Sequence, residues 1–139
     1  MRSHSQKLLT PKISGILLAA GLSTRMGEPK QLLPFGNSTI IETVVDNLLA
    51  SKLDEVIVVV GHEAEKIQAC IQHNPVKIVC NPDYRSGMLT SAQCGVRVIS
   101  ESADAFALTL VDQPFVTSDL VDLVIDAYTQ TERGIALPS

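Results

Sequence analysis

Three almost unbroken apolar runs constrain the fold of this chain more than any other feature. They are Ile16–Ala20, Val56–Val60 and Phe106–Val111. A strand with one face in water alternates apolar and polar residues, whereas a strand covered by helices on both faces is apolar throughout. The three runs therefore predict strands buried in the middle layer of an α/β protein.

Segments with helical periodicity lie between and after these runs. The predicted helices span about Thr39–Leu49, Glu63–Gln72, Leu89–Ile99 and Ser118–Thr129. Thr39 and Glu42 have the spacing of a capping box, in which each side chain bonds to the backbone N–H of the other residue. In the third segment, helical spacing predicts a buried stripe formed by Leu89, Ala92, Val96 and Ile99.

Alternating strands and helices predict βαβ units and therefore a mainly parallel sheet. We expect a three-layer, Rossmann-like α/β fold, to which Val76–Cys80 and Ile135–Leu137 add two weaker strands. The 139 residues are enough for one compact domain. We assign residues 14–139 to this domain and residues 1–13 to a polar N-terminal extension.

The charge balance and the short apolar segments narrow the class of function. Asp and Glu number 15 against 11 Lys and Arg, which gives a formal net charge of −4. Such a mildly acidic chain lacks the basic surface that nucleic acids and anionic membranes attract. No apolar run reaches the length of a membrane span or a signal-peptide core, and the three cysteines show no C-x-x-C spacing. We expect a cytoplasmic protein that binds neither nucleic acid nor membranes.

A glycine-containing polar loop follows the first apolar run, and parallel sheets bind ligands beyond the carboxyl ends of their strands. The loop includes Gly21, Arg25, Gly27 and Lys30. Its backbone N–H groups would form an anion-binding nest beside two cations, although an ordinary loop with two solvated cations is the alternative. Ser23 replaces the second glycine of the dinucleotide motif, and no Lys-Ser or Lys-Thr pair completes a P-loop after Gly27.

Two more polar segments follow predicted strands at the same edge. Asp112 comes directly after the third apolar run, where a carboxylate can hold Mg²⁺ over a polyphosphate; a turn or cap residue is the alternative. Asn81–Met88 follows Val76–Cys80, and Asx and Gly turns would account for its composition. Its position makes it a candidate ligand loop, because three strand ends then meet at one crevice.

These segments also carry a family resemblance. Leu18–Gly27, Lys30 and Leu32–Gly36 resemble the opening signature of the MobA-like nucleotidyltransferases, and most closely the molybdenum cofactor cytidylyltransferase branch. The family's later segments follow in order as Val59–Gly61, Asn81–Tyr84, Gly87–Ser91 and Asp112–Pro114. The resemblance extends from about residue 14 to the end of the chain.

The resemblance implies a transferase that moves CMP from CTP to a molybdopterin-type phosphorylated cofactor, with Mg²⁺ as its metal and pyrophosphate as a product. A molybdoenzyme apoprotein is an implied partner. Ala20 stands where guanylyl-transferring relatives carry Gly, and its Cβ would leave less room for a purine, which favours CTP. Two alternatives stay open. One is transfer of GMP or AMP to another small phosphorylated acceptor, and the other is a catalytically silent nucleotide-binding module that serves a partner apoenzyme.

The family pattern also implies roles for individual residues. The nucleoside would be bound by backbone groups of Leu18, Ala19, Ala20 and Gly21 and enclosed by Asn81, Gly87 and Ser91. Arg25 and Lys30 would grip the triphosphate, and Asp112 would hold Mg²⁺, so that these three residues carry the catalytic step. The transfer requires in-line positioning and neutralisation of charge more than covalent chemistry by the protein.

Family members continue beyond the position at which this sequence stops. They carry a Gly-x-Pro acceptor loop and a Gly-Asp segment that supplies a second metal carboxylate, and neither follows Ile135–Ser139. We therefore expect the domain to be incomplete at its C-terminus. Such a chain would bind nucleotide without appreciable cytidylyl transfer, because positioning of the acceptor accounts for much of the catalysis in such reactions.

Overall fold

A parallel five-stranded sheet forms the centre of the protein. The computed structural model describes residues 11–21, 24–25, 28–111, 117–131 and 135–136. The strands are β1 (Ile13–Ala19), β6 (Glu55–Val60), β7 (Lys77–Cys80), β8 (Ala105–Leu110) and β9 (Ile135–Ala136). Their order is β7-β6-β1-β8-β9, and every neighbouring pair is parallel. The three apolar runs are therefore the three central strands, as the sequence predicts.

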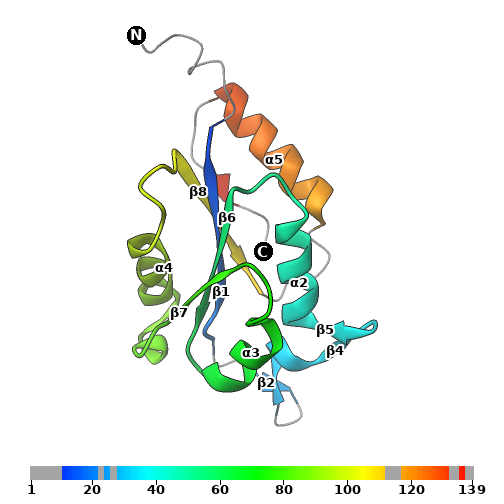
Figure 1. Ribbon diagram of the computed structural model, residues 1–139. Helices are drawn as coiled ribbons and strands as arrows, with labels where there is room; N and C mark the ends of the chain where they lie inside the picture. The colour runs from blue at the N-terminus through cyan, green and yellow to red at the C-terminus, as the bar shows by residue number, and fades with distance from the viewer. Residues whose placement is uncertain (1–10, 22–23, 26–27, 112–116, 132–134, 137–139) are drawn as a thin grey trace.

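Helices cover both faces of this sheet and make the three layers (Figure 1). The helices are α2 (Ile40–Leu49), α3 (Ala64–Ile71), α4 (Met88–Arg97) and α5 (Ser118–Thr131). Helix α4 packs on one face, and α2, α3 and α5 pack on the other. The capping box is confirmed, since the Glu42 N–H donates to Thr39 Oγ1 at 3.2 Å and the Thr39 N–H donates to Glu42 Oε1 at 2.9 Å.

Short elements connect the ends of these strands and helices. Two hairpins, β2 (Thr24–Arg25) with β3 (Glu28–Pro29) and β4 (Pro34–Phe35) with β5 (Ser38–Thr39), flank the short helix η1 (Lys30–Leu32). A second short helix, η2 (Tyr84–Ser86), leads into α4. Both short helices lie between a strand of the central sheet and the next long helix along the chain.

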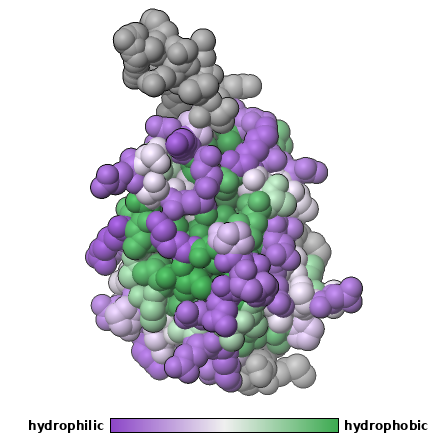
Figure 2. Space-filling view, viewed as in Figure 1, coloured by the Kyte–Doolittle hydropathy of each residue, from purple (hydrophilic) through white to green (hydrophobic). Residues whose placement is uncertain are grey.

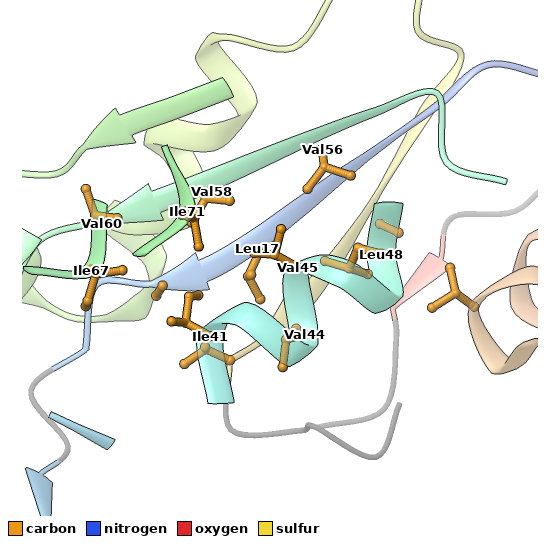
Figure 3. Packing of buried hydrophobic residues seen from close by; sticks show 14 of the residues in the cluster. Leu17, Ile41, Val44, Val45, Leu48, Val56, Val58, Val60, Ile67 and Ile71 are labelled. Atoms are coloured by element: carbon orange, nitrogen blue, oxygen red, sulfur yellow. The ribbon is translucent and has the colours of Figure 1, made fainter. Parts of the chain in front are cut away.

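The larger part of the core lies between β1, β6 and the helices α2 and α3. Figure 3 shows Leu17 of β1 and Val58 of β6 packed against Ile41, Val45 and Ile71, and each of these five side chains is fully buried. Burial of one such aliphatic side chain contributes about 1.5–3 kcal/mol. Figure 2 shows that apolar side chains also gather in the middle of one face of the molecule, between polar margins.

The predicted buried stripe of α4 is only partly confirmed, because Ala92 and Ile99 are partly buried and pack against the core but the other two residues do not. Leu89 and Val96 are exposed by 69% and 42%, whereas Ser91 and Gly95 face the sheet and are buried. The reason is a close helix-to-strand contact, because a Cβ at Gly95 would lie 2.6 Å from Ile16 Cγ2 of β1. Small residues therefore define the inner face of this helix, and hydrophobic periodicity alone selects a neighbouring face.

The amino ends of the strands surround a hollow of about 330 Å³. It is lined by Lys12, Ser14, Asp54, Glu55, Ser100, Ser102 and Ala103. Asp104 accepts a 2.7 Å hydrogen bond from the Lys12 N–H, and Asp54 accepts one of the same length from the Ile13 N–H. These carboxylates thus satisfy backbone donors where the strands begin.

Glu55 is the most highly connected of these carboxylates. Its Oε2 accepts hydrogen bonds from Ser14 Oγ at 2.7 Å and from the Ser100 N–H at 2.8 Å, and its Oε1 lies 3.2 Å from Lys77 Nζ. Burial raises the pKa of this carboxyl, but the hydrogen bonds and the Lys77 ion pair lower it by more. The pKa of Glu55 therefore lies below its ordinary value, and the charged form is stabilised in the folded protein.

Candidate functional site

A cavity of about 340 Å³ opens at the carboxyl end of β1, at the opposite edge of the sheet. Its walls are formed by Leu18, Ala20, Gly21, Lys30, Gln31, Tyr84, Arg85, Gly87, Met88, Ser91, Leu110 and Val111. The chain runs from β1 to β6 on one side and later returns to β8 on the other. The cavity thus lies at the point where the strand order reverses, which is where open parallel sheets bind their ligands.

The backbone that follows β1 is held by three other segments. The Leu18 carbonyl accepts from the Val111 N–H at 3.3 Å, and the Ala20 carbonyl accepts from the His62 N–H at 3.3 Å. The Ala19 carbonyl accepts from Gln31 Nε2 at 3.0 Å. The ends of β6 and β8 and the helix η1 therefore fix the loop that the sequence predicts to bind an anion.

Three glycines lie at this edge of the sheet, and the structural reason for a glycine differs among the three positions. A Cβ at Gly61 would lie 2.7 Å from Tyr84 Cβ and 2.9 Å from Ala20 Cβ, so the glycine allows close packing within the protein. A Cβ at Gly21 would meet no described atom within 4 Å, so packing of the described residues does not require that glycine. Gly87 has φ +115°, a conformation that side chains rarely adopt.

Positive charge faces the cavity from two sides. Lys30 of η1 and Arg85 of η2 both line it, and the Arg85 guanidinium carbon lies 5.3 Å from the centre of the Tyr84 ring. Gly87 is the N-cap residue of α4 and Ser91 lies in its first turn, and the N-terminus of this helix carries a partial positive charge. This edge of the sheet therefore suits an anionic ligand such as a phosphate group.

Asn81 supports the cavity wall and is not part of it. Its side chain is 1% exposed, and its Nδ2 donates at 2.9 Å to both Thr90 Oγ1 and Ser91 Oγ. Its Oδ1 accepts from the Asp83 N–H at 2.9 Å. Asn81 thus joins the end of β7 to the start of α4 and fixes Ser91, which does line the cavity.

Most of the predicted nucleotide-binding residues come together at this cavity. Leu18, Ala20, Gly21, Lys30, Gly87 and Ser91 line it. Ala19 is fully buried beside it and contributes the carbonyl that Gln31 bonds. Arg25 lies in β2, but its side chain is outside the part that the structure describes. Asp112 lies outside the described residues, and Val111, which precedes it, lines the cavity.

The metal prediction rests on Asp112. Within the described residues, no group of three His, Cys, Asp or Glu side chains could hold a metal ion. No described helix is long and apolar enough to cross a membrane. Asp112 itself lies outside the described residues, so its role in holding Mg²⁺ stays a prediction.

Sequence reasoning assigned no individual role to several residues of the cavity wall, although three of them lie in the candidate ligand loop Asn81–Met88. They are Gln31, Tyr84, Arg85, Met88, Leu110 and Val111. Gln31 stands between Lys30 and Leu32, two residues that carry the family resemblance. A polar residue directly after a predicted phosphate-binding lysine was the available signal.

Comparisons with known proteins agree with this geometry. The chain belongs to the MobA-like NTP transferase domain family, whose model matches residues 15–139. The chain is 36% identical to nicotine blue oxidoreductase from Paenarthrobacter nicotinovorans over 105 residues. This matched stretch covers 75% of this chain and 51% of that protein. Over 109 residues the chain is 35% identical to the molybdenum cofactor cytidylyltransferase of Escherichia coli, and the match covers 78% of this chain and 55% of that protein.

Another relative is a probable molybdenum cofactor guanylyltransferase of Bacillus cereus, 31% identical over 129 residues, with 91% of this chain and 62% of the relative covered. The chain thus spans about half to three-fifths of the length of these curated relatives. Among solved structures, the Mycobacterium tuberculosis protein Rv0371c gives a TM-score of 0.78 at 28% identity, with 88% of this chain and 62% of that chain covered. The same protein has been solved in complex with manganese, with a TM-score of 0.74.

Proposed function

We propose that the chain binds a nucleoside triphosphate in the cavity beyond β1, as part of a protein that transfers CMP from CTP to a molybdopterin-type phosphorylated acceptor. The observation that carries this proposal is the convergence of Gly21, Lys30 and the first turn of α4 on one cavity. Family membership and the relative named as a molybdenum cofactor cytidylyltransferase support it. Residues 14–139 would form the nucleotide-binding part of the domain that performs this function.

The residues of the cavity divide the work of binding. The triphosphate carries several negative charges, which Lys30, Arg25 and the N-terminus of α4 would balance. The open space above Gly21 would let the ligand approach the backbone closely. Ser91, fixed by Asn81, would present its hydroxyl to the nucleoside.

In the transfer step, an oxygen of the acceptor's phosphate attacks the α-phosphorus of CTP. The bond from this phosphorus to the bridging oxygen breaks, and pyrophosphate leaves with the bonding electrons. The attacking oxygen is ionised at neutral pH, so the step needs no general base. Lys30 and Arg25 would stabilise the charge that develops on the leaving pyrophosphate.

We assign Asp112 as the residue that would hold Mg²⁺. A bound divalent ion would supply neutralisation of phosphate charge in the transfer step. The manganese complex of Rv0371c supports a divalent metal in a related fold. Asp112 follows Val111 in the sequence, and the Val111 N–H is bonded to the Leu18 carbonyl at the cavity.

Ala20 favours CTP over a purine nucleotide. Its side chain is 3% exposed and faces the backbone of Gly61, and the residue lines the cavity. The support for less room for a two-ring base is the family pattern, in which guanylyl-transferring relatives carry Gly at this position. GMP transfer is the second candidate function, because the Bacillus cereus relative is named as a probable guanylyltransferase.

A thermal-shift experiment tests the proposal directly. The chain is heated with CTP, GTP or ATP, each with Mg²⁺, and the melting temperature is measured. A nucleotide at about 100 times its Kd adds about 2.7 kcal/mol to the stability of the folded state. For a chain of this size, that raises Tm by roughly 8–10 °C. We expect the largest shift with CTP; a larger shift with GTP would favour guanylyl transfer, and no shift with any of the three would exclude the proposal.

A further inference from the structure

Gln31 is an unusual residue for the wall of a cavity, because its polar side chain is only 2% exposed. It lies in η1, next to Lys30. Glutamine is mostly found at protein surfaces, and a buried one normally has its amide fully hydrogen-bonded. The partners of this amide therefore indicate why it is buried.

One half of the amide holds the loop that follows β1. Gln31 Nε2 donates to the Ala19 carbonyl at 3.0 Å and approaches the Gly21 carbonyl at 3.5 Å. Both partners are acceptors, so the NH₂ group must be on this side of the amide. The orientation of the side chain is therefore fixed by its own hydrogen bonds, and the oxygen is the atom left for another partner.

The other half of the amide has no partner within the part of the chain that the structure describes. Gln31 Oε1 is buried and accepts no hydrogen bond from the residues that the structure describes. Thr109 Oγ1 is in the same condition, but Thr109 is not part of the cavity wall. An unsatisfied buried acceptor is unfavourable, and a donor brought in by a ligand would remove that cost.

We propose that Gln31 is a positioning residue for the nucleotide and accepts a hydrogen bond from it. Nε2 holds the Ala19–Gly21 backbone in place, and Oε1 receives an O–H or N–H group of the nucleotide. The proposal rests on the proposed function, since it takes the occupant of the cavity to be a nucleoside triphosphate. CTP offers such donors at its two ribose hydroxyls and at the amino group of its base.

This arrangement couples the nucleoside to the phosphate-binding lysine. Lys30 and Gln31 are consecutive residues of one short helix, and both line the cavity. A nucleotide donor bonded to Gln31 would fix η1 against the bound nucleoside, and with it the position of Lys30. Gln31 would thus act on the transfer step through the placement of its neighbour.

A cycle that combines a protein variant with nucleotide analogues tests the proposal. Gln31→Met keeps the length of the side chain and removes both polar atoms. The affinity of the native chain and of this variant is measured by calorimetry for CTP and for three analogues. They are 2′-deoxy-CTP, 3′-deoxy-CTP and the triphosphate of a cytidine analogue that lacks the base amino group.

We expect one analogue to bind the native chain about 5- to 10-fold more weakly than CTP, as loss of one hydrogen bond implies. The same analogue and CTP should bind Gln31→Met with affinities that agree within about 2-fold. A purely structural role would weaken all four ligands equally in the variant. Equal ratios for every analogue would overturn the proposal.

A measurement on the native chain covers the case in which Gln31→Met fails to fold. The NMR shift of the Gln31 side-chain carbonyl carbon should change when CTP binds and should stay near its free value with the analogue that lacks the donor. No change at saturation with CTP would overturn the proposal.

If the native chain binds no nucleotide, the proposed function is wrong, and the assignment of Gln31 is wrong with it. If it binds CTP but the cycle is additive, only the assignment of Gln31 falls.

Discussion

The two ends of the sheet carry hollows of similar size, about 330 Å³ at the amino end and about 340 Å³ at the carboxyl end. At the amino end, Asp54, Asp104 and Glu55 are bonded to backbone or side-chain donors of the protein itself. At the carboxyl end, Gln31 lines the hollow and its Oε1 is a buried acceptor with no partner among the described residues, while a Cβ at Gly21 would meet open space. Volume therefore does not distinguish a ligand site from a structural hollow. What distinguishes the two hollows is whether their polar groups already have hydrogen-bond partners within the protein.

The largest expected effect is on catalysis, and it distinguishes the lysine at the carboxyl end of the sheet from the lysine at the amino end. Lys30→Ala should lower kcat for CMP transfer by about 100-fold or more, because one transition-state charge contact is lost. Lys12→Ala, in the other hollow, is the matched control and should leave transfer unchanged. CTP affinity is measured in the 139-residue chain, and pyrophosphate release in any form of the protein that transfers CMP. Equal effects of the two variants would contradict the assignment of Lys30.

The glycines of the two ends should also differ in their tolerance of a methyl group. Gly61→Ala should lower the free energy of unfolding by about 1–3 kcal/mol, because the new Cβ meets Tyr84 Cβ and Ala20 Cβ, which cannot move aside. Gly15→Ala brings its Cβ to 2.6 Å from Leu53 Cδ1, the far end of a flexible side chain, and should cost less. Urea unfolding of both variants measures the difference. A larger loss for Gly15→Ala would show that the carboxyl end is not the more tightly packed one.

Nucleotide choice sharpens the description of the carboxyl end. If the methyl group of Ala20 excludes purines, Ala20→Gly should improve GTP binding relative to CTP by about 1–2 kcal/mol. The gain is modest because removing a clash does not add hydrogen bonds to guanine. Calorimetric titration of both nucleotides into the native chain and the variant provides the measurement. Equal affinity of the native chain for CTP and GTP would refute the steric explanation.

The smallest effect concerns Glu55 at the amino end. Its folded pKa lies below the unfolded value, so its stabilisation is fully present above the unfolded pKa of about 4.3 and is lost as pH falls through the folded pKa. Glu55→Gln should therefore lower the free energy of unfolding by roughly 0.5–1 kcal/mol at pH about 7, with the difference shrinking in acid below pH about 4.

Urea unfolding at several pH values follows this difference, with the exposed Glu65→Gln as a control for the loss of one negative charge. CTP affinity should be the same in Glu55→Gln and the native chain. A loss of CTP affinity would show that the amino-end hollow is linked to the ligand site.

The layers of the fold could be predicted from the sequence because burial on both faces leaves a continuous apolar pattern. The start of β1 could not be predicted in the same way. Ser14 lies before the apolar run Ile16–Ala20, yet it belongs to β1 and is 1% exposed, because its hydroxyl donates to Glu55. The inner face of α4 was predicted only in part for a related reason: Ala92 and Ile99 pack on the core, but the close contact of Gly95 with Ile16 depends on tertiary packing that hydrophobic periodicity does not encode.

The candidate site was predictable where it follows the ends of strands. Gly21 and Lys30 were found from the loop after β1, and the structure places both at the cavity. Gln31 was missed because its burial depends on carbonyl groups 10 and 12 positions earlier in the chain. Asn81 was predicted to enclose the nucleoside, and the structure shows it fixing Ser91; direct contact with a nucleotide stays a prediction.

The order of the strands has a consequence for how this chain folds during synthesis. β1 is the central strand, with β6 on one side and β8 on the other. The Lys12 N–H and Asp104, bonded beside the β1–β8 pair, are 92 positions apart. A growing chain can pair β1 with β6 early, but the other edge of β1 stays unpaired until β8 has been made. Such non-local pairing slows folding and leaves an apolar strand edge open to wrong partners, so cellular yield should depend on how quickly β8 follows.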